Sequence, residues 1–162
     1  MKKKFVSSAL IISTAIGILL YISSCKTVDV FERNVPIPAQ EWQNSFKPSL
    51  DFVITDTLSS YNIYVTLRHT HAYNYNNIWL NINYQLPGDT LNKQRVNLTL
   101  ANEKGWLGIG MDDIYEIRQL ITPQPFRFKK SGQAIFTLEQ VMRENPLKHI
   151  MNAGIRVEKV QH

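Results

Sequence analysis

Cysteine is almost absent from this sequence: among 162 residues, only Cys25 carries a thiol. A single cysteine excludes an intrachain disulfide and any zinc site built from several cysteines. Glycine and proline are also scarce, with seven residues each, and charged residues make up only 19% of the chain. Together with 44% hydrophobic residues, these low fractions exclude collagen-like, coiled-coil and wholly disordered proteins. The length suits one domain with a core of its own.

The excess of basic residues is concentrated at one end of the chain. The formal net charge is +5, and Lys2, Lys3 and Lys4 supply three of these charges. Without residues 1–24 the chain has 15 basic and 13 acidic residues, which is a net charge of +2. A body so close to neutrality lacks the basic surface that nucleic-acid binding requires. We therefore expect no nucleic-acid partner.

The N-terminus has the three-part layout of a secretory signal. The three lysines are followed by the apolar segment 5–22 and then by Ser23 and Ser24, directly before Cys25. An ordinary signal does not need a cysteine here, whereas a lipoprotein signal does, because the thiol is acylated and begins the mature chain. Residues 22–25 resemble a bacterial lipobox. We expect residues 1–24 to be removed, and fatty chains on Cys25 to anchor the body to a membrane outside the cytoplasm.

The alternative for this segment is a transmembrane anchor. Residues 5–22 number 18, which is just enough to cross a bilayer as a helix. In that case the three lysines remain on the cytoplasmic side and Cys25 has no special role. The position of the only cysteine at the expected processing site favours acylation.

The rest of the chain is dominated by alternation with a period of two, which indicates strands with one buried face. The positions expected to point inward are Tyr61, Ile63, Val65 and Leu67, then Ile78, Leu80, Ile82 and Tyr84, then Val96, Leu98 and Leu100. Segments 50–54 and 155–158 follow the same rule. One polar face per strand is typical of antiparallel sheets that cover a core on one side.

Turn residues between these segments indicate the fold class. Residues 86–89, Leu-Pro-Gly-Asp, are a strong turn signal, and the polar run 129–132 is another. Short strands at such intervals predict an all-β fold, an antiparallel β-sandwich or jelly-roll-like domain over residues 49–162. Residues 25–48, which contain three prolines, are expected to form an extended segment next to the anchor.

One short helix is expected within this domain. Thr137 is a suitable N-cap, and Gln140 follows it by three residues, as in a capping box. Asn145 and Pro146 provide a stop signal. We therefore predict a helix over residues 138–143.

Two histidines have a spacing that can hold a metal, but too few other ligands accompany them. His69 and His71 lie two residues apart at the end of a predicted strand, and the other histidines are far away in the sequence. A metal site needs further ligands. The favoured interpretation is a pair of exposed histidines, and we expect neither a metal nor a cofactor.

The glycine-rich run 105–110 invites comparison with a phosphate-binding loop. It lacks the terminal Gly-Lys-Ser/Thr of that motif, and the following Asp112 and Asp113 would repel a phosphate. These aspartates and Glu116 also lack the spacing of an EF-hand calcium loop. We expect a tight, close-packed loop.

The segment around residues 69–79 is the best candidate for a binding surface. Tyr73, Tyr75 and Trp79 lie among asparagines, and these residue types are favoured by protein-binding and sugar-binding surfaces. The alternative is a loop whose tyrosines cover the edge of the sandwich. No Ser-His-Asp or Cys-His arrangement is recognisable, and the only cysteine is expected in the anchor, so we do not expect an enzyme.

Three segments taken together resemble a known family. They are the aromatic-rich stretch 42–68, the segment 106–115 (WLGIGMDDIY), and residues 131–159, which begin SGQAIFTLEQVMR. In this order they are similar to GldH, the gliding-motility lipoprotein family of the Bacteroidetes, over nearly the whole mature chain. The resemblance implies an envelope lipoprotein that supports gliding and, by association, the type IX secretion machinery through protein–protein contacts. It implies no enzymatic activity and no cofactor.

Two further expectations accompany this resemblance. Some lipoproteins of these bacteria carry an acidic run after the cysteine when they are sent to the cell surface, and residues 26–30 contain no such run. The body is therefore expected to face the periplasm. The alternative function is a lipid-anchored carbohydrate-binding module that stacks sugars on Tyr73, Tyr75 and Trp79.

Overall fold

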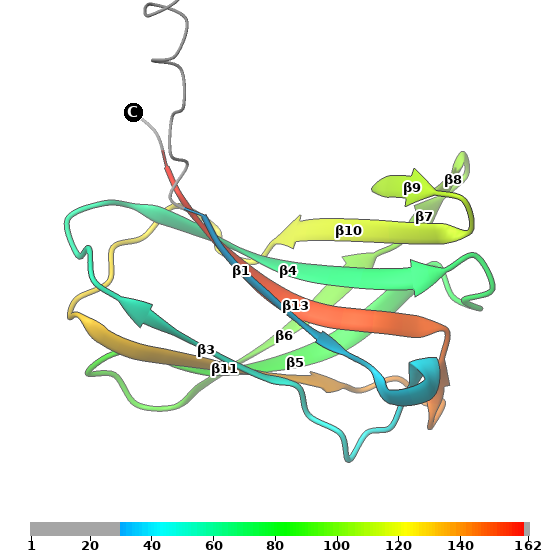
Figure 1. Ribbon diagram of the computed structural model, residues 1–162, viewed down its shortest axis with the longest axis horizontal. Coiled ribbons are helices and arrows are strands. Elements are labelled where there is room, and N and C mark those ends of the chain that lie inside the picture. The colour runs from blue at the N-terminus through cyan, green and yellow to red at the C-terminus, as the bar shows by residue number, and fades with distance from the viewer. Residues whose placement is uncertain (1–29, 161–162) are drawn as a thin grey trace, which may run out of the picture.

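Two antiparallel sheets face each other in the computed structural model, which describes residues 30–160 (Figure 1). The first sheet contains, in spatial order, β1 (Val30–Pro36), β13 (Ile150–Lys159), β4 (Tyr61–Thr70), β10 (Ile114–Leu120) and β9 (Ile109–Met111). The second contains β3 (Ser49–Ile54), β11 (Gly132–Gln140), β5 (Asn77–Gln85) and β6 (Asn92–Thr99). The predicted all-β, antiparallel sandwich is confirmed.

Two short strand pairs and one turn of 3-10 helix complete the described residues. They are β2 (Glu41–Trp42) with β12 (Leu147–Lys148), β7 (Ala101–Asn102) with β8 (Gly105–Trp106), and η1 (Pro38–Gln40). Across the described residues, no helix has the length and apolar character needed to cross a membrane. The predicted signal segment 1–24 and Cys25 lie outside these residues.

The buried faces of the strands are those that the alternation predicts. Both sheets place aliphatic and aromatic side chains in one shared core. The buried residues of the predicted inward sets are Ile63, Val65, Leu67, Ile78, Leu80, Ile82, Leu98 and Leu100. Tyr61, Tyr84 and Val96 are half-buried at the margins of this core. The period-two pattern of the sequence therefore indicates which face of each strand points into the core.

The predicted helix over residues 138–143 is wrong, because this segment belongs to β11 and the turn after it. β11 pairs with β3 on one side and with β5 on the other. Ala134, Phe136 and Leu138 point into the core, whereas Thr137 and Glu139 alternate with them. The resemblance to a capping box is local. Pairing of residues 138–140 with β5 continues the strand and outweighs this local helix signal.

The sandwich begins earlier in the chain than residue 49, because part of the proline-containing segment 25–48 forms a strand. β1 pairs with β13 along its whole length, from Val30 opposite Glu158 to Pro36 opposite Asn152. Trp42 is completely buried, and its Nε1 donates a hydrogen bond to the Phe46 carbonyl oxygen at 2.9 Å. Residues 30–48 therefore contribute two strands, β1 and β2, and two core residues, Ile37 and Trp42, to the domain that the sequence places at 49–162.

His69 is completely buried. Its Nδ1 donates to the Thr70 carbonyl oxygen at 2.9 Å, and its Nε2 has no partner within the described residues. Burial lowers the pKa of His69 from its ordinary value, and the hydrogen bond to Thr70 opposes that shift only in part. The expected pair of exposed histidines is thus wrong for His69, which packs against three aromatic rings.

Replacing Val65 by aspartate should unfold the domain. Val65 is fully buried in β4, and an unpaired carboxylate there costs on the order of several kcal/mol of unfolding free energy. Val53 is 70% exposed in β3, so Val53→Asp is the matched control and should change the free energy by less than about 0.5 kcal/mol. Urea denaturation followed by circular dichroism measures both. Equal midpoints for the two variants would contradict the burial of Val65.

Mild acid should weaken the fold through His69. Its pKa is lower in the folded than in the unfolded state, so the unfolded chain binds more protons, and stability falls as pH drops below the unfolded pKa. Between about pH 7.5 and pH 5.5 the loss is at most about 1.4 kcal/mol per pH unit. His69→Phe should flatten this dependence of the unfolding free energy, and His71→Gln, at an exposed position, should retain it. A His69→Phe variant with the wild-type pH slope would contradict this assignment.

Candidate partner-binding surface

The sandwich has two ends, which differ in their relation to β1. We call the loops 55–60, 86–91 and 121–131 the proximal end, because β1 begins beside them: Val30 lies opposite Glu158, and the adjacent Lys159 lies opposite Tyr61. We call residues 71–76 and 100–113 the distal end. Figure 1 shows the three proximal loops at one end of the molecule, with β7, β8 and β9 at the other.

Tyr73, one of the three candidate surface residues, is buried. Only 4% of it is exposed, and its ring packs against those of His69, Tyr75 and Trp106. Its hydroxyl donates to the Asn77 carbonyl oxygen at 3.1 Å. Burial, with smaller contributions from Tyr75 and Glu144, raises the pKa of Tyr73 far above its ordinary value. Tyr73 therefore supports the 71–76 loop from inside.

Tyr75 and Trp79 reach the surface on either side of the 141–144 turn. They are 37% and 38% exposed. The Tyr75 hydroxyl donates to a Glu144 carboxylate oxygen at 2.8 Å, and this bond raises the pKa of Tyr75. The Trp79 backbone N–H points to the Met142 sulfur at 3.3 Å, and the Arg95 guanidinium lies 5.0 Å from the centre of the Trp79 ring. Tyr75 and Trp79 are thus the two candidate residues at the surface, and the candidate ring that Tyr75 contacts is that of the buried Tyr73.

The two sequence-predicted histidines form part of an aromatic cluster. His69 and His71 both contact the rings of Trp106 and Tyr115. The Trp106 Nε1 donates to the exposed His71 Nδ1 at 3.2 Å. Within residues 30–160, no group of three or more His, Cys, Asp or Glu side chains is placed to hold a metal. Through these ring contacts the end of β4 and the β4–β5 loop pack against Trp106 of β8 and Tyr115 of β10.

The glycine-rich run 105–110 includes β8 and most of β9, and it is tightly packed only at Gly108 and Gly110, whereas Gly105 faces open space. Gly108 has φ of +87°, and a Cβ at this position would collide with the Glu116 carbonyl oxygen. Asp112, with φ of +52°, and Asp113 form the turn that joins β9 to β10. The glycines and aspartates therefore belong to a β-hairpin, although their spacing superficially resembles a calcium-binding or phosphate-binding loop.

A second exposed surface, which the sequence patterns do not indicate, lies on the β9–β10 hairpin. Ile109, Met111 and Ile114 are exposed by 69%, 75% and 37%. Met111 lies directly opposite Ile114, and Ile109 is two residues along β9, so the three side chains share one face of the hairpin. The sequence feature that could have indicated this surface is the apolar Ile-x-Met-x-x-Ile spacing next to a turn. The same spacing is equally typical of a strand in the core.

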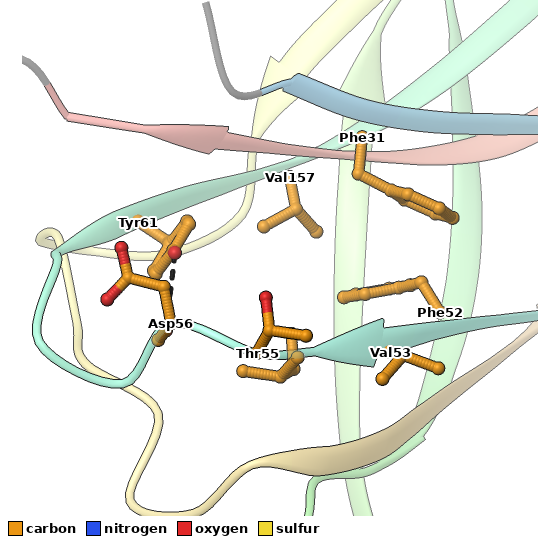
Figure 2. Close-up of a pocket in the computed structure, with 8 residues that line it drawn as sticks. Phe31, Phe52, Val53, Thr55, Asp56, Tyr61 and Val157 are labelled. Atoms are coloured by element: carbon orange, nitrogen blue, oxygen red, sulfur yellow. Dashed lines mark hydrogen bonds between the residues drawn. The ribbon is translucent and has the colours of Figure 1, made fainter.

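Two hollows lie at the proximal end. One has a volume of about 260 Å³ and lies between β1 and β3, where the Tyr61 hydroxyl donates to the Asp56 carbonyl oxygen at 3.2 Å. Figure 2 shows Phe31, Phe52 and Val157 among its lining residues. The other, of about 290 Å³, lies between the β5–β6 hairpin and residues 121–126. Neither hollow is lined by Tyr73, Tyr75 or Trp79.

Comparisons with known proteins agree on one relationship. A family model described as GldH lipoprotein matches residues 29–157. The gliding motility lipoprotein GldH of Flavobacterium johnsoniae is 27% identical over 151 residues, which cover 88% of this chain and 91% of that protein.

A likeness to a solved structure is much weaker. The subviral particle of infectious bursal disease virus VP2 is 14% identical, with a TM-score of 0.34 over 85% of this chain and 34% of the viral chain. A score this low does not establish a shared fold.

Since the family match runs from the start of β1 into β13, the chain belongs to the GldH lipoprotein family, as its three conspicuous sequence segments indicate.

Proposed function

We propose that this protein is a lipid-anchored component of the cell envelope that supports gliding motility and the associated type IX secretion machinery through contacts with other envelope proteins. Its family and its relative, a gliding motility lipoprotein, support the role in motility. Acyl chains on Cys25 hold the mature chain at the membrane, and the body faces the periplasm. The protein works by binding rather than by catalysis.

The exposed apolar face of the β9–β10 hairpin carries this proposal. Ile109, Met111 and Ile114 form a contiguous apolar patch at the distal end, and such patches mark protein contacts more often than isolated exposed residues do. β9 is also an edge strand of its sheet, so its outer backbone groups can pair with a strand of a partner. This end points away from the start of β1, where the anchor enters.

The carbohydrate-binding alternative has less support. Sugar stacking needs open aromatic faces, whereas Tyr73 is buried and Arg95 lies over the Trp79 ring. Tyr75 alone remains of the three expected platforms. A polysaccharide pull-down distinguishes the two functions, because saturable binding that is lost in Trp79→Ala would favour the carbohydrate-binding module.

Cys25→Ser should prevent acylation. Diacylglyceryl transfer needs the thiol, so the variant should accumulate as a precursor that retains residues 1–24 and incorporates no labelled palmitate. Ser24→Ala, which brings the sequence nearer to the usual lipobox, is the control and should be processed normally. Palmitate labelling and the intact mass of the purified protein measure both properties. Palmitate incorporated into Cys25→Ser would refute the anchor.

Charging the apolar hairpin should abolish partner binding without unfolding the domain. In the source bacterium, the double variant Ile109→Asp/Met111→Asp should reduce colony spreading and type IX secretion, while its melting temperature stays close to that of the wild type, because both side chains are exposed. A photo-crosslinking residue at position 111 should capture envelope proteins.

Val53 provides the control for this experiment. It is as exposed as Met111 but lies in the other sheet, so Val53→Asp should leave spreading unchanged, and a crosslinker there should capture none of those partners. Normal spreading and secretion in the double variant would exclude the hairpin as the contact surface.

A further inference from the structure

The anchor holds the proximal end of the sandwich close to a bilayer. Cys25 precedes Val30 by five residues, and five residues span at most about 17 Å even when fully extended. Val30 lies in β1, two strands away from Tyr61 of β4, which corresponds to roughly 10 Å across the sheet. The loops next to Tyr61 are therefore within reach of the lipid surface. This step rests on the acylated Cys25 of the proposed function.

The first proximal loop presents a leucine on a rigid support. The Asp56 carboxylate accepts hydrogen bonds from the backbone N–H groups of Leu58 and Ser59, from the Ser59 hydroxyl, and from Lys159 Nζ at 2.9 Å. The bonds from Ser59 and Lys159 hold the pKa of Asp56 well below its ordinary value. Leu58, at the tip of this loop, is 82% exposed, more than any other large hydrophobic residue described.

The second proximal loop presents another leucine in a similar way. The Asp89 N–H donates to the Leu86 carbonyl oxygen at 3.0 Å and closes the turn around Gly88, which has φ of +78°. The Asp89 carboxylate pairs with Lys129 at 3.3 Å. Leu91 follows this turn and is 69% exposed. In each leucine-bearing loop an aspartate therefore forms the hydrogen bonds that close the turn, and its carboxylate pairs with a lysine: Asp56 with Lys159, and Asp89 with Lys129.

The third proximal loop supplies positive charge. Residues 127–130, Arg-Phe-Lys-Lys, lie beside the other two loops, since Phe126 pairs with Tyr61 and Lys129 with Asp89. Within the part of the chain that the structure describes, Arg127 and Lys130 form no ion pair with a carboxylate. The proximal loops therefore carry a net positive charge. At the distal end, Asp112 and Asp113 occupy the β9–β10 turn.

We infer that the proximal end is a second membrane contact: the tips of the loops that carry Leu58 and Leu91 enter the lipid interface, while Arg127 and Lys130 lie against anionic headgroups. Apolar side chains backed by basic residues are the combination that binds membrane surfaces. The tether makes this contact intramolecular, so the loops meet the bilayer at a high effective concentration and need only a weak affinity. The body then stands on the membrane with β9 directed away from it.

The test measures the depth of each end in a bilayer. Because the only native cysteine is the acylated Cys25, a cysteine introduced by Thr57→Cys or Thr90→Cys, beside the two leucines, is the single free thiol and accepts an environment-sensitive fluorophore. Met111→Cys reports on the distal end. The acylated mature protein is reconstituted in vesicles of phosphatidylethanolamine and phosphatidylglycerol. The labels at 57 and 90 should emit at shorter wavelength and be quenched by lipids brominated in their acyl chains, whereas the label at 111 should be quenched only by aqueous iodide.

Variants separate the apolar and the electrostatic parts of the contact. Leu58→Ser/Leu91→Ser should abolish the wavelength shift at position 90, whereas Ile109→Ser, the matched change at the distal end, should not. Arg127→Gln and Lys130→Gln should each lower the ratio of docked to undocked molecules by about fivefold on anionic vesicles and have no effect on pure phosphatidylcholine. Lys104→Gln, at an exposed distal position, is the control.

Two results would overturn the inference. Iodide quenching at positions 57 and 90 equal to that at 111 would leave the proximal end free for a protein partner. Lipid quenching at all three positions would mean that the body lies flat. The intact mass of the same sample reports acylation separately: if no acyl chain is present, the proposed anchor fails and Cys25 is itself a free thiol. The three cysteine variants are then remade in the mature chain with Cys25→Ser, labelled and added to preformed vesicles, where the labels test the loops alone.

Discussion

The pairing of β13 with both β1 and β4 holds the rest of the structure in place. The last strand of the chain lies between the first strand and a central one, so the five-stranded sheet is complete only when segments more than a hundred residues apart have met. Gly154 permits this closure: a Cβ there would collide with Asn34 and Thr66, and the Thr66 hydroxyl donates to the Asn34 side-chain oxygen at 2.6 Å across it. The shared core and the positions of the two ends follow from this sheet.

Most strand faces could be predicted from the sequence because each depends on neighbours two residues away. Ile78, Leu80 and Ile82 are buried, and Trp79 between them is exposed, as alternation requires. Residues 138–143 could not be assigned in this way, since the decisive interactions are the pairing of residues 138–140 with β5, which lies more than fifty residues upstream. Considered without its partner strands, this short amphipathic segment has the pattern of a helix.

The candidate surface was predictable only in part, for a related reason. Trp79 lies on a strand, so its outward direction could be inferred, whereas Tyr73 and Tyr75 lie in a loop without a period, and one is buried while the other is half exposed. Ile109 and Met111 posed the opposite problem. Apolar residues beside glycines suggest a core, and only the strand order places them on β9, at the edge of the sheet.

The antiparallel pairing of β1 with β13 also determines how the protein bears mechanical load. β1 begins near the anchor and runs toward the far end of the sandwich, so a pull between the lipid and a distal partner acts along the strand. Its ladder hydrogen bonds are perpendicular to that direction, and all seven register pairs from Val30 to Pro36 resist at once in shear. A force across the strand would instead peel these pairs apart one by one. The pairing of β1 with β13 therefore resists a pull along β1 better than a pull across it.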